Sequence, residues 1–451
     1  MELQEQLDTL AKELEVPGAV AGVIMGDEQF VAATGVTSLE QPLPVTAQTL
    51  FQFGSTGKTY TATAMLVLVE RGLVALDATV RTYVPDLALK DAQVAEAVTI
   101  QHLFNHTAGW SGDAMTSGSD EGDDVLRRFV ASMADLDQVT PLGSSVSYNN
   151  AALSLAGHVI ERVTGKTYEG ALQELVLEPA GLHDTWFFPY DIMTRAFVCG
   201  HKPGPDGELV VARPWGLARA GNPAGGMSAT IGDQLRWAQL HLGHLGELVI
   251  SRELRELMQQ PTIECPGNAL GDAIGISWLL GRHGEVRTVS HGGTTNGQLA
   301  EFTMAPDRDF AFVCMTNASP TGAVLYERLQ DWAFEHYLQV VRPPITTVTL
   351  PADRLEEYVG VYDTIAAAVT VTAQDGGLLM SVEYTPETIA ALFERPEDAP
   401  ESTPMEVGFI EGRPDQIAAL GQAMGVFVRD RDGRITALSA GGRTAVRRSL
   451  G

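Results

Sequence analysis

The spacing of apolar residues changes along this chain, and that change constrains the fold more than any other feature. Leu3, Leu7 and Leu10 recur at helical spacing, and a β-hairpin pattern follows over 19–35. The next part is mainly helical, with a long helix from Ser55 and others expected over 99–106, 149–164, 167–177, 228–243 and 252–260. Short β-type runs occupy 272–316, and a last amphipathic helix covers 324–337. Helices between an early hairpin and late strands predict an antiparallel sheet with the N-terminal hairpin at its edge.

A second change in pattern, near residue 343, predicts a second domain. The segment Val341-Arg-Pro-Pro-Ile-Thr-Thr has the composition of a linker, and residues from about 350 onward are mostly short β-type runs separated by turns. Such runs predict a small antiparallel β-barrel of lipocalin-like form. The 451 residues, of which 45% are hydrophobic, are enough for two cores. We therefore expect an α+β fold with domains at 1–342 and 343–451.

The charge balance excludes several classes of partner. The chain has 57 acidic against 30 basic residues, a formal net charge of −27. Such an excess repels phosphate backbones and anionic lipid surfaces, so we expect neither nucleic acid nor membrane as a partner. The acidic start Met1-Glu-Leu-Gln lacks the basic and apolar regions of a signal peptide. A cytoplasmic protein is expected, or a periplasmic or secreted one if a leader was removed.

The first candidate for catalysis is Ser55 with Lys58, at the start of the predicted long helix. Residues three apart lie on one helical face, so the lysine amine can reach the serine hydroxyl and act as its base. The chain has only five lysines, which leaves few chances for this spacing to arise by accident. An ordinary helix cap with an exposed lysine is the alternative. The same residues also resemble the end of a phosphate-binding P-loop, but Gln52 occupies its first glycine position.

Two further segments carry candidate site residues. Tyr148 precedes a predicted helix, where its phenol can shuttle protons, and Asn150 can donate its amide to a substrate carbonyl. Helix capping by asparagine is the simpler alternative there. His291-Gly292-Gly293-Thr294 is expected on a strand whose glycines let a ligand approach the backbone, with His291 able to hydrogen-bond a substrate or a tyrosine. A bulge or turn is the alternative.

Metal binding is not expected. His102 and His106 have metal-ligand spacing on a predicted helix, but Leu103 stands where the H-E-x-x-H motif has glutamate and no third ligand follows. The three cysteines are far apart and lack the spacing of a zinc site or a disulfide framework. We predict no cofactor.

The order of these motifs resembles the serine β-lactamase and penicillin-binding-protein superfamily, specifically its class C branch. That branch includes D-aminopeptidases, D-Ala-D-Ala carboxypeptidases, esterases and class C β-lactamases. The resemblance covers about residues 5–340 and extends to secondary motifs. These are Leu103–Trp110, Pro223–Ser228, Phe302–Pro306 and Met315–Asn317.

The resemblance implies a fold in which an antiparallel sheet packs against a helical lobe, with the active site between them. It implies that Ser55 is the acylated nucleophile and that Lys58 and Tyr148 share the proton transfers, without deciding which is the base. The resemblance further implies that the backbone N–H groups of Ser55 and Thr294 form the oxyanion hole and that Asn150 holds the substrate amide. Near the motifs, Trp110, Trp215 and Asn222 are candidates for a substrate pocket.

One departure from the family pattern bears on substrate. The chain has His291-Gly-Gly where β-lactamases and carboxypeptidases usually have K-T-G, and imidazole is a poorer permanent partner for a carboxylate than an ammonium. The expected activity is therefore acyl-enzyme hydrolysis of small amides or short peptides, including those with D-residues. A carboxylesterase with weak β-lactamase activity and a non-catalytic penicillin-binding-like protein are the alternatives. A homo-oligomer is left open.

Overall fold

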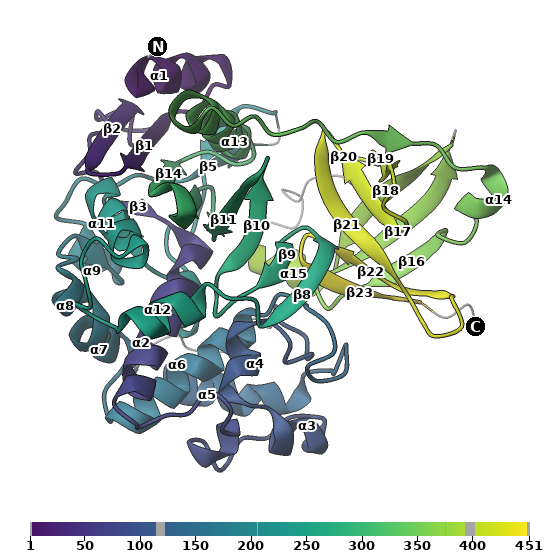
Figure 1. Cartoon of the computed structure of the whole chain (residues 1–451), viewed down its shortest axis with the longest axis horizontal. Coiled ribbons are helices and arrows are strands. Elements are labelled where there is room, and N and C mark those ends of the chain that lie inside the picture. The colour runs from purple at the N-terminus through teal and green to yellow at the C-terminus, as the bar shows by residue number, and fades with distance from the viewer. Residues whose placement is uncertain (1, 114–121, 205, 375, 393–401, 449–451) are drawn as a thin grey trace.

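The computed structural model describes residues 2–113, 122–204, 206–374, 376–392 and 402–448 (Figure 1). Figure 1 shows a larger lobe, in which helices cover a sheet, beside a barrel of green to yellow strands. No helix in these ranges is long and apolar enough to cross a membrane. The expected α+β architecture is confirmed. The expected boundary between residues 342 and 343 stays a prediction.

The sheet of the larger lobe is antiparallel throughout and begins with the N-terminal hairpin. Its strand order is β2-β1-β14-β13-β11-β10-β9-β8, and β12 pairs with β13. The bounds are β1 Gly18–Met25, β2 Glu28–Gly35, β8 Ile263–Asn268, β9 Gly271–Ile274, β10 Leu279–His283, β11 Val286–Ser290, β12 Gly293–Thr294, β13 Leu299–Ala305 and β14 Phe310–Thr316. Strand β2 lies at one edge, which confirms the predicted position of the hairpin.

Helices cover both faces of this sheet. The side chains of β14 alternate between the two cores that result. Phe310 and Phe312 pack with helices α1 (Leu3–Glu13) and α13 (Thr321–Ala333). Ala311, Val313 and Met315 face the core that contains α2 (Gly57–Glu70) and α11 (Ile231–Leu242). The sheet is therefore buried on both sides.

Of the remaining helices, Figure 1 shows α3, α4, α5 and α6 below the sheet and α7, α8 and α9 at the left. The bounds of the remaining helices are α3 Ala92–Ala97, α4 Ile100–Phe104, α5 Val125–Ser132, α6 Asn150–Thr164, α7 Tyr168–Leu172, α8 Glu178–Ala180, α9 Pro189–Ile192, α10 Asn222–Gly225 and α12 Arg252–Met258. Three expected helices are shorter than predicted, one of them being α12, which was expected over 252–260 and ends at Met258. The helix expected over 99–106 ends at Phe104. The one expected over 228–243 begins at Ile231, because the Thr230 side chain caps it and Ser228–Ala229 pair as strand β7.

Short strands complete the larger lobe. Strand β7 lies between β3 (Phe51–Gln52) and β4 (Thr185–Trp186), and β5 (His201–Pro203) pairs with β6 (Leu209–Val211). Strand β3 runs directly into a short 3₁₀ turn, Gly54–Thr56, that leads into α2. The pairing of β3 with β7 therefore ties the start of α2 to the segment that follows Pro223.

The C-terminal strands form a closed antiparallel barrel. Strands β16 to β23 pair in chain order, β16 also pairs with β23, and β15 adds to β19. The bounds are β15 Thr347–Val348, β16 Gly360–Asp363, β17 Ala367–Gln374, β18 Gly377–Tyr384, β19 Met405–Ile410, β20 Gln416–Ala419, β21 Gln422–Arg429, β22 Ile435–Ala440 and β23 Arg443–Arg447, with helices α14 Ala352–Leu355 and α15 Pro386–Leu392. The predicted β-barrel is confirmed.

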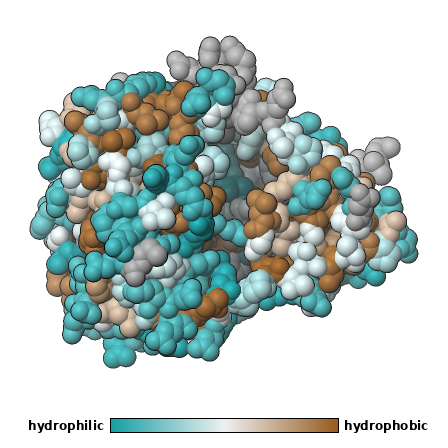
Figure 2. Space-filling view, turned by 90° about the horizontal axis from the view of Figure 1, so that it is seen from above, coloured by the Kyte–Doolittle hydropathy of each residue, from teal (hydrophilic) through white to brown (hydrophobic). Residues whose placement is uncertain are grey.

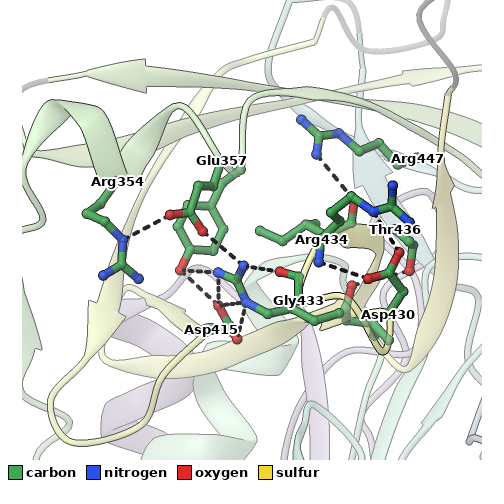
Figure 3. A network of polar contacts seen from close by, with 12 residues as sticks. Arg354, Glu357, Asp415, Asp430, Gly433, Arg434, Thr436 and Arg447 are labelled. Atoms are coloured by element: carbon green, nitrogen blue, oxygen red, sulfur yellow. Dashed lines mark hydrogen bonds and ion pairs between the residues drawn. The ribbon is translucent and has the colours of Figure 1, made fainter.

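A polar network closes one end of this barrel (Figure 3). The Asp415 carboxylate accepts hydrogen bonds from the Tyr358 hydroxyl at 2.8 Å and from Arg429 Nη2 at 2.9 Å. Arg429 also pairs with Glu357, which in turn pairs with Arg354. Burial alone raises the pKa of Asp415, but the hydrogen bonds from Arg429 and Tyr358 bring it below its usual value. The network therefore stabilises the charged carboxylate.

The barrel packs against the larger lobe close to the start of α6. Asn268 Nδ2 donates to Ser439 Oγ at 3.1 Å, and Tyr148 N donates to the Gly442 carbonyl at 2.8 Å. Figure 2 shows a hollow between the two lobes. A cavity of about 540 Å³ also lies between them, with Val146 on one wall and Val446 on the other. Residues far apart in the sequence thus meet near Tyr148.

Candidate active site

Ser55 and Lys58 are in contact at the start of α2, as their spacing predicts. Lys58 Nζ lies 3.0 Å from Ser55 Oγ and donates to the Ala224 carbonyl at 2.7 Å. The lysine side chain is fully buried. The alternative of an exposed lysine after a capping serine is therefore wrong.

The surroundings of Lys58 disfavour its charged form. Burial, together with the Arg443 cation, holds the pKa of Lys58 well below its usual value, although the Asp113 carboxylate raises it. A lysine with a lowered pKa is more often neutral and can accept a proton. The site thus places a potential base against the Ser55 hydroxyl.

Tyr148 lies beside both Ser55 and Lys58. Its ring centre is 4.8 Å from Lys58 Nζ, and its hydroxyl is hydrogen-bonded with Ser55. Burial raises the pKa of Tyr148, whereas the hydrogen bond with Ser55 and the Arg443 cation lower it, and the net direction is upward. The phenol therefore stays protonated at neutral pH, and Lys58 is the stronger candidate for the base.

The two asparagines after Tyr148 have different positions. Asn149 caps α6, because its Oδ1 accepts from Ala152 N at 2.8 Å, and its Nδ2 donates to the Trp110 carbonyl. Asn150 does not cap the helix: its Nδ2 donates to Asp113 Oδ1 at 2.9 Å. The alternative of helix capping by asparagine is therefore correct for Asn149, whereas the Asn150 side chain binds Asp113.

The His291-Gly292-Gly293-Thr294 segment lies only in part on a strand. Strand β11 ends at Ser290 and β12 is Gly293–Thr294, so the expectation of a strand holds for Gly293 and Thr294, while His291 and Gly292 connect the two strands. The His291 carbonyl accepts from the Thr56 hydroxyl at 2.7 Å, and Nδ1 lies 2.7 Å from the Gly292 carbonyl. Burial and the Lys58 cation lower the pKa of His291 to about 3, so the imidazole is neutral at physiological pH.

Close backbone contacts hold the Ser55 turn against this segment. A Cβ atom at Gly293 would lie 1.9 Å from the Phe53 carbonyl oxygen and 2.8 Å from Ser55 N. One at Gly54, whose φ is +52°, would lie 2.6 Å from Thr294 N. Only glycine fits such contacts. The backbones that carry the Ser55 and Thr294 amides therefore lie against each other, as an oxyanion hole built from both would need.

Two residues absent from our sequence analysis complete the site. Arg443, the first residue of barrel strand β23, pairs with the Asp113 carboxylate, and its guanidinium lies 5.2 Å from the Tyr148 ring centre. Asp113 also accepts the hydrogen bond from Asn150. The pair joins residues 330 positions apart. The only local signal for Arg443 is the Gly441-Gly442 turn before it, which does not identify a site residue.

His106 also lies in the site, which the sequence analysis did not predict. Its ring centre is 4.3 Å from that of Tyr148, and its Nδ1 lies 3.2 Å from Asn149 N. Burial and the Lys58 cation lower the pKa of His106 well below its usual value. A neutral imidazole therefore packs behind the tyrosine.

Residues 3–333 match the protein family described as Beta-lactamase. The chain belongs to this family of serine hydrolases. Penicillin-binding protein 4 from Amycolatopsis lactamdurans is 32% identical over 354 residues, which cover 76% of this chain and 92% of the relative. The Beta-lactamase of Escherichia coli (strain K12) is 27% identical over 233 residues, 52% of this chain and 58% of the relative. The resemblance stated from the motifs is confirmed.

A solved structure that resembles the whole chain is that of SurE with D-Leu. It has a TM-score of 0.74 and 23% identity, and the match covers 99% of this chain and 98% of SurE. This likeness extends the shared fold beyond the Beta-lactamase match to the barrel.

The three candidates for a substrate pocket have different positions in this member of the Beta-lactamase family. Trp110 is buried in the core. Trp215 is half-buried, and its Nε1 donates to the Val198 carbonyl at 2.8 Å. Asn222 is buried, and its Nδ2 donates to Glu169 Oε1 at 2.8 Å. It lies two residues before Ala224, whose carbonyl accepts from Lys58. Asn222 therefore anchors α10, the short helix whose Ala224 carbonyl binds Lys58.

The sequence analysis placed His102 and His106, which have metal-ligand spacing, on one predicted helix, and this prediction is wrong. Helix α4 ends at Phe104, and His106 beyond it has a left-handed φ of +60°. His102 instead hydrogen-bonds with Thr99 at the start of α4. Among the described residues, no group of three or more His, Cys, Asp or Glu side chains is arranged to hold a metal ion.

Proposed function

We propose that this protein hydrolyses small amides or short peptides, including those with D-residues, through an acyl-enzyme on Ser55. The observation that carries the proposal is the buried contact between Ser55 Oγ and Lys58 Nζ at 3.0 Å, with the Tyr148 hydroxyl on the same serine. A serine hydroxyl needs a base to become a nucleophile, and a buried lysine with a lowered pKa supplies one. The roles of these three residues follow from that arrangement.

Acylation begins when the neutral Lys58 amine takes the Ser55 proton and Oγ attacks the substrate carbonyl carbon. The carbonyl oxygen becomes an oxyanion, to which the backbone N–H groups of Ser55 and Thr294 donate. As the C–N bond breaks, the leaving amine takes a proton from Tyr148, which recovers one from Lys58. Water then attacks the ester carbonyl carbon while Lys58 takes its proton, the bond to Ser55 Oγ breaks, and Oγ takes a proton from Tyr148, which recovers one from Lys58 as the acid is released. Each oxyanion donor is worth about 10²–10³ in rate.

The charges at the site favour a substrate without a free carboxylate beside His291. That imidazole is neutral, and the nearby Arg443 cation is already paired with Asp113. Both facts support an aminopeptidase or amidase over a carboxypeptidase. Asn150, whose side chain binds the same carboxylate as Arg443, is the residue that we assign to the substrate amide. The likeness to SurE with D-Leu supports the choice of D-residues for the first substrates to test.

Intact-mass analysis with a fluorophosphonate tests the acyl-enzyme. We expect one adduct on the wild type and none on Ser55→Ala, since the Ser55 hydroxyl is the one that contacts Lys58. A wild type that stays unlabelled by fluorophosphonate and penicillin alike would overturn the proposal in favour of a non-catalytic binding protein. Rates on D- and L-aminoacyl anilides and on p-nitrophenyl esters then separate a peptidase from a carboxylesterase.

A homo-oligomer is part of the same proposal. The octameric penicillin-binding protein homologue from Pyrococcus abyssi shares the fold over 99% of both chains, with a TM-score of 0.67 and 20% identity. Light scattering of the purified protein tests this assembly, and a monomer mass at micromolar concentration would rule it out.

A further inference from the structure

The barrel contributes three consecutive contacts to the segment that carries Tyr148. The Gly442 carbonyl accepts from Tyr148 N at 2.8 Å, and Thr444 N donates to Ser147 Oγ at 3.2 Å. Between them, Arg443 reaches into the larger lobe and forms a two-pronged pair with Asp113. The start of β23 is therefore docked by its backbone on both sides of the arginine, which fixes where the guanidinium lies.

The carboxylate that pairs with Arg443, that of Asp113, also binds a candidate site residue. Asp113 Oδ1 accepts from both Arg443 Nη2 and Asn150 Nδ2, each at 2.9 Å. The side chains of Arg443 and Asp113 are 39% and 23% exposed, so water screens the pair only in part. An unpaired carboxylate at this place would be free to turn away from Asn150 and would attract protons to its neighbours.

We propose that Arg443 is a positioning residue of the active site: it holds Asp113 against Asn150 and offsets the Asp113 charge at the Lys58 amine. The inference rests on the proposed function, because it gives Lys58 the role of base. The barrel thereby contributes to the site, since the Arg443 cation offsets the Asp113 charge near Lys58 only when β23 is docked. Arg443 acts through other residues and is not assigned a contact with substrate.

The charged and titratable groups around Lys58 come from four segments of the chain. They are His106, Asp113, Tyr148, His291 and Arg443. Burial lowers the pKa of both histidines and raises that of the tyrosine, so all three are neutral at pH 7. Asp113 and Arg443 are then the two groups whose charge Lys58 feels, with opposite effects on its pKa.

The test is an NMR titration of the Lys58 amine that needs no substrate. The chain has only five lysines, so protein labelled with ¹³C at lysine Cε gives five signals, and Lys58→Arg assigns the one from Lys58. We expect Arg443→Met to raise the proton affinity of Lys58 by about tenfold and Asp113→Asn to lower it by about as much. Arg443→Lys, which keeps the charge, should stay close to the wild type.

Arg448→Met is the matched control, because Arg448 forms a similar two-pronged pair with Asp363 at the end of the same strand. It should leave the Lys58 titration unchanged. Shifts of opposite sign in Arg443→Met and Asp113→Asn support the proposal. Equal titrations in both variants and the wild type, with all proteins folded by circular dichroism, would overturn it. Failure of the proposed function is seen separately, as a Ser55 that no probe labels.

Discussion

Two arginine–aspartate pairs in this molecule have similar chemistry and different consequences. Arg429 and Asp415 lie 14 residues apart at one end of the barrel, and their shared partner is Tyr358. Arg443 and Asp113 lie 330 residues apart, and their partners are Asn150 and the face of Tyr148. Both pairs are partly shielded from water. We therefore expect the groups around a pair to decide what it does: the first should stabilise the barrel, and the second should act on the proposed reaction.

The largest expected effect on kcat comes from removing the Lys58 amine, on which we propose that the Arg443–Asp113 pair acts. Lys58→Ala should lower kcat by about 10²–10⁴, because Ser55 loses its base. Arg443→Met should then have a smaller effect on kcat in the Lys58→Ala background than in the wild type, since only its effect on Asn150 through Asp113 remains. Steady-state rates of the single and double variants measure both effects. Independent, multiplicative losses would show that Arg443 acts by another route.

Breaking the barrel pair should instead change stability. Asp415→Asn keeps a residue that tolerates the left-handed φ of +64° but removes the charge that Arg429 and Tyr358 bind, at a cost of about 1.5–3 kcal/mol. Urea unfolding followed by circular dichroism measures the loss. Activity per folded molecule should not change. A large fall in kcat with unaltered stability would contradict the contrast between the pairs.

The same variant has an expected pH dependence. Since the pKa of Asp415 is lowered in the folded protein, its contribution to stability is present above its unfolded pKa and is lost as pH falls through the folded pKa. The stability difference between wild type and Asp415→Asn should therefore be constant near neutral pH and shrink below about pH 4. A difference that grows in acid would mean that the carboxylate is not the stabilised form.

The smallest effect is expected from a third pair, between Arg448 and Asp363. Their side chains are 59% and 37% exposed, so Arg448→Met should cost no more than about 1 kcal/mol and leave kcat unaltered. Thermal unfolding and one rate measurement check both. A larger loss of stability would show that an Arg–Asp pair stabilises the folded protein even without buried partners.

Much of the fold could be predicted because it depends on local pattern. The helical spacing of Leu3, Leu7 and Leu10, the hairpin that follows and the turn-separated runs after residue 350 all appear in the structure as expected. Helix ends were less accurate, since capping by Thr230 and the short pairing of Ser228 depend on neighbours. The contact of Lys58 with Ser55 was predictable for the same reason: three residues of helix bring them together.

The sequence by itself determined the motif order, the helical spacing that joins Ser55 to Lys58 and the existence of a C-terminal barrel. Only the tertiary structure decided that Asn149, not Asn150, caps α6, that His106 packs behind Tyr148, and that Arg443 enters the site from the barrel. The reason is physical. Local periodicity follows from backbone geometry, whereas the pKa of a buried amine follows from desolvation and from charges that reach it from distant segments.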